Sequence, residues 1–458
     1  MSEGSAARAV ILAAGHGRRM RSRLPKVLHP VGGLPLLEHS LRLALEAVGG
    51  TPLVVIPEQG AEPLRELLGE RAETVVQPEP RGTGDALERA LGVLPDVQVV
   101  LALPADMPLL PAAALRSLLQ ARKGVGAGAA MLTVVRADAG GFGRVERTPA
   151  GRFLRVVEEA DQPWDGLPAE VNCGAYALRV GPAREALARL GPDNAQGERY
   201  LSWLPQLIEG EVVTVDLGEA ELAVQVNDRL QLAEAEALMR RRTLERLMRS
   251  GVTVVDPAAT WVDCEVEVGE DTTLHPGTVL RGRTRIGSGC QIGPFAEMED
   301  VEVGEGCRVG RAHLCGCKLG AGVEVGPFNR VRPQSTLGPR SHLGTFTEVV
   351  RTTVGESTQV PHLSYLGDAE LGADVNVGAG SITANWDGHE KHRTVVEDGA
   401  RLGSDTILVA PVRVGEGAYT GAGSVITGDV PAQALGVARA RQRNLPDYAR
   451  RARRQGQR

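Results

Sequence analysis

The chain has 458 residues, and 51 Lys and Arg against 57 Asp and Glu give it a net charge of −6. At about 150 residues per domain, this length predicts two or three domains, each with its own core. The mildly acidic balance argues against a nucleic-acid partner, and no apolar run approaches the roughly 18 residues needed for membrane insertion as a helix. Glycine contributes 57 residues and aromatic residues only 3%, which indicates tight turns and repeated small side chains.

The N-terminal segment and the cysteines bear on the compartment. The first ten residues, MSEGSAARAV, lack the charged and apolar stretches of a signal peptide, so none is predicted. Six cysteines are too few for a disulfide scaffold. Cys315 and Cys317 flank one glycine as metal-binding pairs can do, but no second Cys or His pair lies at zinc-finger spacing. We therefore expect reduced cysteines and a cytoplasmic protein.

Up to about residue 227, short apolar stretches alternate with segments rich in Ala, Leu and Glu. The apolar stretches predict buried strands over residues 9–12, 52–56, 97–103 and 130–135. The segments between them predict helices, among them residues 34–48 and 85–94. This alternation is typical of a Rossmann-like α/β domain, in which helices cover both faces of a parallel sheet. Ligands of such sheets bind at the carboxyl ends of the strands.

A single long helix is expected next in the chain. No Gly or Pro interrupts the stretch from Leu230 to Arg249, which is rich in Ala, Leu, Glu and Arg. This composition predicts a long, exposed helix that acts as a rigid spacer. It divides the sequence into a first domain over residues 1–228, a helical linker over 229–250 and a second domain over 251–458.

The second domain has a repeat of its own. An aliphatic residue recurs every six, and sometimes every five, positions from Val268 to Val414, and a glycine often follows it directly. A segment near 381–395 interrupts the period. Such a period is typical of an all-β, left-handed parallel β-helix of hexapeptide repeats, in which each face of a coil directs one aliphatic side chain inward. The Arg-rich end after Leu445 predicts a solvated, partly disordered tail.

The first candidate functional residues lie directly after the first predicted strand. The segment from Leu12 to Met20 reads LAAGHGRRM, and its small residues allow backbone N–H groups to approach a phosphate. Met20 takes the place of the third glycine of the dinucleotide motif G-x-G-x-x-G, which excludes that motif. Lys26 follows Pro25 and is one of only four lysines among 51 basic residues. Its retention in an Arg-rich chain indicates a site that needs a compact ammonium group.

Further polar residues follow the predicted strands in chain order. Gln77 and the stretch Arg81-Gly82-Thr83 offer amide and backbone donors suited to reading a base edge. Asp106 comes just after the strand over 97–103, where a carboxylate can be a Mg²⁺ ligand, although a lone Asp there is more often a turn former. Later polar motifs contain Gly143, Glu158, Asn172, the segment 194–198 and Asn227.

The combination L-x-x-G-x-G-x-x-M followed by P-K resembles the nucleotidyltransferase motif of sugar-1-phosphate pyrophosphorylases. With the later motifs and the hexapeptide repeats, the chain resembles the bifunctional N-acetylglucosamine-1-phosphate uridyltransferase/glucosamine-1-phosphate acetyltransferase family of bacterial cell-wall precursor synthesis. The resemblance covers about residues 8–445. It implies a homotrimer that uses UTP, acetyl-CoA and sugar phosphates, with Mg²⁺ as cofactor.

For the first domain, the resemblance implies in-line attack of the sugar-phosphate oxygen on the α-phosphorus of UTP, with release of pyrophosphate. The residues implied for the uridine nucleotide and its phosphates are Leu12, Ala13, Ala14, Gly15 and Lys26. Those implied for the uracil are Gln77, Gly82 and Thr83, and those for N-acetylglucosamine are Gly143, Glu158 and Asn172. Asp106 and Asn227 would ligate Mg²⁺.

For the second domain, the resemblance makes His362 the general base that takes a proton from the glucosamine amine as it attacks acetyl-CoA. Glu348 would orient the imidazole. The residues implied for the sugar phosphate are Arg332, Tyr365, Asn376 and Lys391. Those implied for acetyl-CoA are Ala379, Asn385, Trp386, Ser404, Ala422 and Arg439. The family builds this site between subunits.

Several positions depart from the pattern of the family. Arg18 stands in place of Thr or Ser, and Trp203 in place of an acidic residue. Val350 stands where the family has a phosphate-binding Lys, with Arg351 one position later. Neighbouring strand residues point to opposite sides, so Arg351 can take over only if the coil shifts or its side chain reaches around. Trp386 replaces a Tyr and lacks the hydroxyl.

Two alternatives assign the β-helix a different role. In the first, the chain is a monofunctional sugar-1-phosphate nucleotidylyltransferase whose β-helix serves oligomerisation or regulation. In the second, the chain catalyses nothing and is a trimeric scaffold that binds sugar nucleotides. His362, Asn385 and Lys391 argue against the first alternative, because a structural coil needs no reactive side chains. Lys26 and Asp106 argue against the second.

Overall fold

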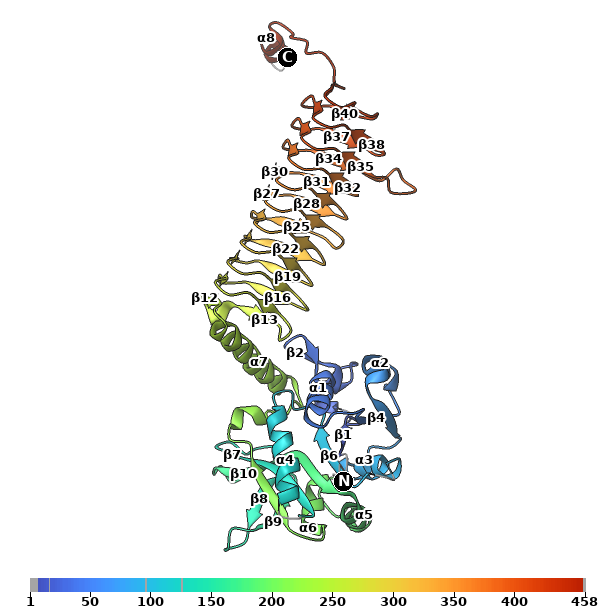
Figure 1. The fold of residues 1–458 in the computed structure, drawn as a ribbon, viewed down its shortest axis with the longest axis vertical. Coiled ribbons are helices and arrows are strands. Elements are labelled where there is room, and N and C mark those ends of the chain that lie inside the picture. Colours follow the sequence, from blue (N-terminus) through green and yellow to red (C-terminus); the bar gives the residue numbers. More distant parts are fainter. Residues whose placement is uncertain (1–6, 16, 95–96, 125–126, 456–458) are drawn as a thin grey trace, which may run out of the picture. The chain divides into compact units, whose positions relative to one another are not determined.

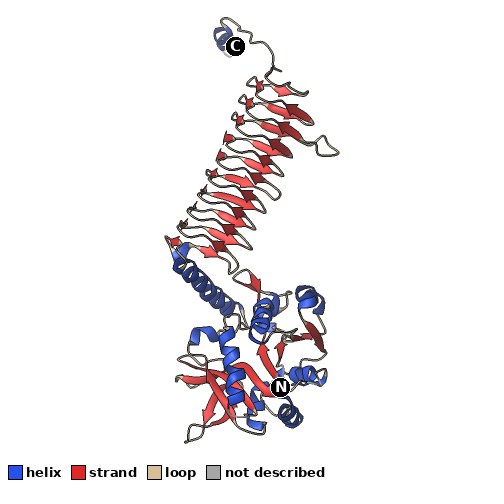
Figure 2. Ribbon diagram, in the orientation of Figure 1, coloured by secondary structure: helices blue, strands red, loops and turns tan. Residues whose placement is uncertain are grey.

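The computed structural model describes residues 7–15, 17–94, 97–124 and 127–455. The chain divides into two compact units, Met1–Arg240 and Arg241–Arg458. The first unit is α/β and the second is built almost wholly of strands (Figures 1 and 2). Because the division falls within helix α7 (Arg229–Arg249), the boundaries predicted at residues 228 and 250 stay a prediction. Among the described residues, every helix is too short or too polar to cross a membrane.

The first unit alternates strands and helices along the chain. Its helices are α1 (Leu36–Val48), α2 (Ala61–Leu68), α3 (Thr83–Gly92), α4 (Ala112–Gly124), α5 (Val180–Arg189) and α6 (Leu204–Leu207). The main sheet holds, in spatial order, β11 (Val212–Asp216), β7 (Ala129–Arg136), β10 (Ala169–Arg179), β6 (Val99–Pro104), β1 (Arg8–Leu12), β4 (Leu53–Pro57) and β5 (Glu73–Gln77). The remaining strands form two hairpins, β8 (Arg144–Arg147) with β9 (Phe153–Val157), and β2 (Pro30–Val31) with β3 (Leu34–Pro35).

Two apolar cores lie on the two faces of the main sheet, because successive strand residues point to opposite sides. Ile11 and Val54 join the core that contains side chains of α1, α2 and α4. Val10 and Val55 join the core that contains side chains of α3 and α5. The predicted Rossmann-like α/β architecture, with helices on both faces, is confirmed.

The sheet is parallel in part and antiparallel at β10, which the expectation of a parallel sheet did not include. β1 runs parallel to β4 and β6, but β10 runs antiparallel to both β6 and β7. The hairpin β8–β9 fills the connection between β7 and β10 where a parallel pair would need a crossover helix, so the chain re-enters the sheet in the opposite direction. β10 was not predicted, because Glu170 and Asn172 break the apolar pattern at its start.

The second unit is a stack of coils in which each coil adds one strand to each of three parallel sheets (Figure 1). The first sheet holds β12 (Thr253–Val254), β15 (Thr273–Leu274), β18 (Gln291–Ile292), β21 (Arg308–Val309), β24 (Glu324–Val325), β27 (His342–Thr345), β30 (Gln359–His362), β33 (Asn376–Val377), β36 (Arg401–Leu402), β39 (Tyr419–Thr420) and β41 (Leu435–Gly436). The second holds β13 (Trp261–Val262), β16 (Val279–Arg281), β19 (Glu297–Glu299), β22 (Ala312–Cys315), β25 (Asn329–Val331), β28 (Glu348–Val350), β31 (Tyr365–Gly367), β34 (Ile382–Ala384), β37 (Ile407–Val409) and β40 (Val425–Ile426). The third holds β14 (Glu267–Val268), β17 (Arg285–Ile286), β20 (Glu302–Val303), β23 (Lys318–Leu319), β26 (Thr336–Leu337), β29 (Thr353–Val354), β32 (Ala369–Leu371), β35 (Thr394–Val396) and β38 (Val412–Val414). This is the hexapeptide β-helix that the sequence predicts.

The aliphatic residues of the repeat, such as Leu343, fill the interior of the coil as predicted. A second inward position, which the sequence analysis missed, lies two residues earlier and carries a small side chain such as Thr272 or Cys290. The Thr272 hydroxyl donates a hydrogen bond of 2.8 Å to the Gly287 carbonyl, so this buried polar group is paired. All six cysteines are free thiols, as predicted, and Cys290 fills the interior of the coil.

The interruption predicted near 381–395 is shorter in the structure. β34 continues the coil with an inward Thr383, whose hydroxyl bonds to the backbone N–H and C=O of Gly367 at 2.7 and 3.0 Å. Strand β34 was not predicted, because its inward residue, Thr383, is polar and does not match the aliphatic period. Only residues 385–393 leave the coil, as a loop between β34 and β35.

The helix predicted over 230–249 is confirmed as α7, but the prediction that it is exposed is wrong for one side. Ala235 is buried, and Leu244 and Leu247 pack into the interior of the first coils. The last turns of α7 therefore close this end of the β-helix. The tail also differs from the prediction, because Tyr448–Gln455 forms a helix, α8, which is exposed over residues 448–453 and whose Ala and Arg residues favour helix formation.

The close stacking of coils predicts a large effect of Gly344→Ala. An added Cβ would overlap the carbonyl oxygen of Pro361 in the next coil. We expect the free energy of unfolding to fall by about 1–3 kcal/mol, because overpacking forces the backbone to shift. Denaturant unfolding measures this change. Gly428→Ala is the matched control, since nothing lies within 4 Å of its added Cβ, and an equal loss in both variants would contradict the argument.

Candidate functional site

The first unit contains a cavity of about 620 Å³ where β1 and β6 end. Most of the residues predicted for UTP and the sugar line it, namely Leu12, Ala14, Gly15, Lys26, Gln77, Gly82, Thr83, Asp106, Gly143, Glu158, Asn172 and Asn227. Ala13 is the exception, because its side chain is buried in the core and its N–H donates to the Val55 carbonyl at 2.9 Å. The cavity lies at the carboxyl ends of parallel strands, the usual place for a ligand in an α/β sheet.

Lys26, Asp106 and Asn227 meet at the cavity wall from three distant segments. Lys26 Nζ lies 2.5 Å from Asp106 Oδ2 and 3.1 Å from Asn227 Oδ1. Gln225 Nε2 approaches the same Asp106 oxygen at 3.3 Å. A carboxylate and an amide oxygen thus converge on one cation, the Lys26 ammonium. These two donors are of the kind that Mg²⁺ accepts, so the residues fit the predicted metal.

The start of α3 forms another part of the wall. Gln77 Nε2 donates to Asp85 Oδ2 at 2.8 Å and to the Gly82 carbonyl at 3.1 Å, which fixes the amide. Gly82 has a φ of +101°, and an added Cβ would lie 2.6 Å from the Arg199 carbonyl oxygen. Only glycine therefore allows this approach of backbone to backbone. Thr83 follows as the first residue of α3.

Glu158 and Asn172 lie near Gly143 at a third part of the wall. Asn172 N donates to the Gly143 carbonyl at 2.9 Å, and its side-chain amide donates to the Tyr176 hydroxyl at 2.6 Å. The Ser202 hydroxyl donates to Glu158. Burial raises the pKa of the Glu158 carboxyl, and the bond from Ser202 offsets only part of that shift.

Several residues of the cavity were missed by the sequence analysis. They are Tyr176, Tyr200 and Ser202. The polar motif over 194–198 pointed to this region, but only the folded chain places Tyr200 and Ser202 beside Glu158. Of the positions that depart from the family pattern, Arg18 lines the cavity. Trp203 packs edge-on against Tyr200, with 5.4 Å between the ring centroids.

In the second unit, His362 belongs to a column that runs along the first sheet. Strand pairing aligns Gln359, Asn376, Arg401 and Tyr419 in successive coils. Three residues further along each coil come His362, Ala379, Ser404 and Ala422. Hydrogen bonds from Asp405 N to the Ala379 carbonyl at 2.7 Å and from Gly423 N to the Ser404 carbonyl at 2.8 Å join these turns. Arg439 reaches the same column and donates to the Ala422 carbonyl at 2.9 Å.

His362 is exposed at the end of β30, where it aligns with Thr345. The Ser364 hydroxyl donates to its backbone carbonyl at 2.8 Å and steadies the turn. The predicted partner Glu348 lies in the second sheet and instead pairs with Arg332, at 3.5 Å between Oε1 and Nη1. The described structure therefore does not bring Glu348 to the imidazole.

A second polar cluster lies at the end of β31. Arg351 donates to Asp368 from Nε at 2.6 Å and from Nη2 at 2.8 Å, and Asn385 donates to the same carboxylate. An added Cβ on Gly367 would lie 2.7 Å from both the Asn385 amide nitrogen and the Tyr365 hydroxyl. Gly367 therefore leaves the space in which these two side chains approach each other.

The charges of this cluster act on Asp368. The hydrogen bonds from Arg351 lower the pKa of its carboxyl most strongly; burial opposes them, while Asn385 and the positive charge of Lys391 lower the pKa further. Asp368 is thus an ionised carboxylate paired with Arg351. Of the other predicted sugar-phosphate residues, Arg332 lies beside β28, whereas Asn376 lies on the first sheet. A single chain does not bring the whole predicted set together.

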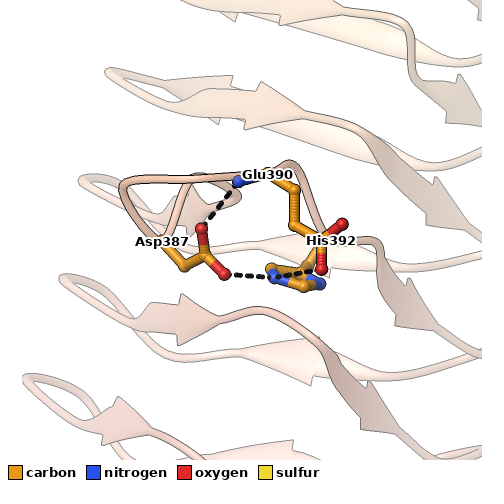
Figure 3. A group of neighbouring side chains, drawn as sticks. All are labelled: Asp387, Glu390 and His392. Atoms are coloured by element: carbon orange, nitrogen blue, oxygen red, sulfur yellow. Dashed lines mark hydrogen bonds and ion pairs between the residues drawn. The ribbon is translucent and has the colours of Figure 1, made fainter.

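The loop before β35 carries the predicted Trp386 and Lys391, which form an antiparallel bridge. Asp387 closes this loop by accepting a backbone N–H bond from His389 at 2.7 Å and another from Glu390 at 2.8 Å. It also pairs with His392 Nε2 at 2.7 Å, and Figure 3 shows this pair and the bond from Glu390. These bonds lower the pKa of Asp387, and the carboxylate raises the pKa of His392. Glu390 completes a group whose ligand atoms are close enough together for a metal ion, but Asp387 and Glu390 are exposed, and bonds within the loop account for the arrangement.

Comparisons with known proteins cover both units. A family model of MobA-like NTP transferase domains matches residues 9–206. The bifunctional protein GlmU of Mycolicibacterium gilvum is 44% identical over 98% of this chain and 93% of its own length. The GlmU proteins of Kineococcus radiotolerans and Brevibacillus brevis are 45% and 42% identical, over 96% and 98% of this chain and 91% and 98% of their own lengths. The chain belongs to the bifunctional GlmU family. The resemblance drawn from the motifs is confirmed.

Proposed function

We propose that the chain catalyses two consecutive steps of UDP-N-acetylglucosamine synthesis, one on each unit. The second unit transfers an acetyl group from acetyl-CoA to glucosamine-1-phosphate. The first unit transfers a uridylyl group from UTP to the resulting N-acetylglucosamine-1-phosphate and releases pyrophosphate. The observation that carries the proposal is that similarity to bifunctional relatives runs through both units, which favours it over the monofunctional alternative.

In the first unit, the cavity holds UTP and the sugar phosphate in line for attack on the α-phosphorus. Leu12, Ala14 and Gly15 bind the nucleotide, with the backbone N–H groups of Ala14 and Gly15 on the phosphates, and Gln77 and the start of α3 bind the uracil. Asp106 and Asn227 would hold Mg²⁺, which neutralises charge on the triphosphate when it is bound. Lys26 neutralises further phosphate charge, so that pyrophosphate can leave.

The sugar is held by Gly143, Glu158 and Asn172, and the raised pKa of Glu158 predicts a pH-dependent KM for N-acetylglucosamine-1-phosphate. An ionised carboxylate accepts hydrogen bonds from sugar hydroxyls on both of its oxygens, whereas a protonated carboxyl accepts fewer such bonds. Because burial raises this pKa, protonation begins at a higher pH than for an exposed glutamate, and KM should rise as the pH falls. In Glu158→Gln, KM should be roughly tenfold higher and lose this dependence. Initial rates of pyrophosphate release at several pH values measure both effects, and a wild-type KM that does not change with pH would contradict the role.

In the second unit, His362 takes a proton from the amine of glucosamine-1-phosphate as the nitrogen attacks the thioester carbonyl. A C–N bond forms, the C–S bond breaks, and the departing CoA sulfur takes up a proton. The residues that hold acetyl-CoA are Ala379, Asn385, Trp386, Ser404, Ala422 and Arg439. Those that hold the sugar phosphate are Arg332, Tyr365, Asn376 and Lys391.

The placement of these residues supports a homotrimer. Asn376 lies on the first sheet beside the column of His362, whereas Tyr365 lies on the second sheet near Asn385 and Asp368. Neighbouring copies of the chain would bring the two groups together and complete the acetyl-transfer site. The six free thiols fit a reducing compartment, and we propose the cytoplasm.

Two assays on the purified full-length protein test the proposal. The first follows CoA release from acetyl-CoA with glucosamine-1-phosphate, and the second follows pyrophosphate release from UTP with N-acetylglucosamine-1-phosphate and Mg²⁺. We expect turnover in both. Pyrophosphate release without CoA release would favour the monofunctional alternative, and turnover in neither would favour a scaffold that only binds sugar nucleotides.

A further inference from the structure

Strand β28 offers no cation to the proposed acetyl-transfer site, because Val350 stands where the family pattern has a phosphate-binding Lys. The Val350 side chain is 3% exposed and aligns with Gly367 of the next coil. The following residue, Arg351, has a φ of +47° in the left-handed region, where residues other than glycine are uncommon. The backbone therefore turns a corner at Arg351, and the alternation of side chains along a strand no longer decides where it points.

The corner directs Arg351 toward the next coil. Asp368 occupies the equivalent corner there, with a φ of +50°, and its N–H donates to the Val350 carbonyl at 3.0 Å. The guanidinium of Arg351 binds the Asp368 carboxylate through Nε and Nη2. A carboxylate that accepts hydrogen bonds from two of the five N–H groups fixes the plane of the guanidinium. The other three N–H groups then remain for a ligand. The Arg351 side chain is 33% exposed, so a ligand can reach them.

Other polar groups surround this pair. The Asn385 amide binds Asp368, and the Tyr365 hydroxyl lies near that amide above Gly367. Lys391 is close enough for its charge to lower the pKa of Asp368. Arg351 and Lys391 are the cations whose charges act on this carboxylate, so positive charge is available beside it for an anion.

We propose that Arg351 binds the phosphate group of glucosamine-1-phosphate and replaces the cation that Val350 does not provide. This inference rests on the proposed acetyl transfer by the second unit. Asp368 orients the guanidinium, and the free donors of Arg351 bind the phosphate oxygens. A lysine at this corner would be a weaker substitute, because a single ammonium cannot offer the planar, paired donors that bind a carboxylate and a phosphate together.

Arg351→Ala tests the inference in the full-length enzyme. KM for glucosamine-1-phosphate should rise about 10–100-fold, since a charge-assisted hydrogen bond is lost. KM for acetyl-CoA and the rate of pyrophosphate release should stay within about twofold of wild type. Arg351→Lys should recover part of the loss. Arg340→Ala is the matched control, because Arg340 also sits at a left-handed corner and pairs with an acid, Glu356, of the next coil.

A substrate without phosphate separates binding from mere support of the fold. With glucosamine as acceptor, Arg351→Ala and wild type should show the same kcat/KM. An equal loss with both acceptors would mean that Arg351 only holds Asp368 and Asn385 in place, and this would overturn the inference. An unchanged KM for glucosamine-1-phosphate in Arg351→Ala would also overturn it, while leaving acetyl transfer by the wild type intact.

Direct binding gives a readout that does not depend on turnover. Calorimetric titration with glucosamine-1-phosphate should show affinity in wild type and a 10–100-fold loss in Arg351→Ala. Binding without any acetyl transfer by wild type would contradict the proposed function alone. Absence of binding in wild type, or equal binding in both proteins, would overturn the assignment of Arg351.

Discussion

His362→Ala should lower kcat for acetyl transfer by about 10²–10⁴-fold and leave pyrophosphate release unchanged. The substrate amine must lose a proton as its nitrogen attacks the thioester, and His362 is the titratable side chain in the column with Ala379, Ser404 and Ala422. Its exposed position lets a substrate reach the imidazole. The measurement is the initial rate of CoA release, with the pyrophosphate assay on the same preparation as a check of folding.

His275→Ala is a control for the loss of any imidazole from the β-helix. His275 lies next to β15 and bonds to Gln291 at 2.9 Å, far along the chain from the column of His362. Acetyl transfer should survive this change. Retention of turnover in His362→Ala would show that solvent or another group accepts the proton, and it would remove His362 from the mechanism.

The β-helix shows how much of a fold a period can predict. The recurrence of aliphatic residues predicted inward positions such as Leu343, because a repeating coil places every sixth residue in the same environment. The small residues two positions earlier were missed, since Thr272 and Cys290 share size rather than hydrophobicity. Thr383 was missed for the same reason, as a polar side chain paired inside the coil looks like a break in an apolar pattern.

The site is less accessible to sequence than the fold. Motifs identified Lys26, Asp106 and Asn227 as candidates. The sequence did not predict that Lys26 Nζ lies 2.5 Å from Asp106 Oδ2 and 3.1 Å from Asn227 Oδ1. Arg351 illustrates a different limit. The rule that strand neighbours point to opposite sides makes it a poor substitute for a cation at Val350, yet the left-handed turn at this corner places it on Asp368. The direction of the Arg351 side chain therefore depends on the local backbone conformation, which in turn depends on the packing of the next coil.

Asp106→Asn should lower the rate of pyrophosphate release by about 10²–10³-fold and leave CoA release unchanged. The substitution keeps the size of the side chain but removes the negative charge that pairs with Lys26 and that we propose as a ligand of Mg²⁺. Asp106 is buried, 6% exposed, and its partners Lys26 and Gln225 are already in place, so the loss is one of charge rather than of shape. The initial rate at increasing Mg²⁺ concentration should show a weaker apparent affinity for the metal in the variant.

Removal of the metal separates the two activities in the unmodified protein. A chelator should stop pyrophosphate release, because Mg²⁺ offsets charge on the triphosphate, and it should leave CoA release intact, because the acetyl transfer is assigned to His362 and needs no metal. Asp138→Asn, a change at a carboxylate outside the cavity lining, should affect neither reaction. If Asp106→Asn and wild type responded identically to Mg²⁺, the metal would be held elsewhere, and Asp106 would act only as the ion-pair partner that positions Lys26.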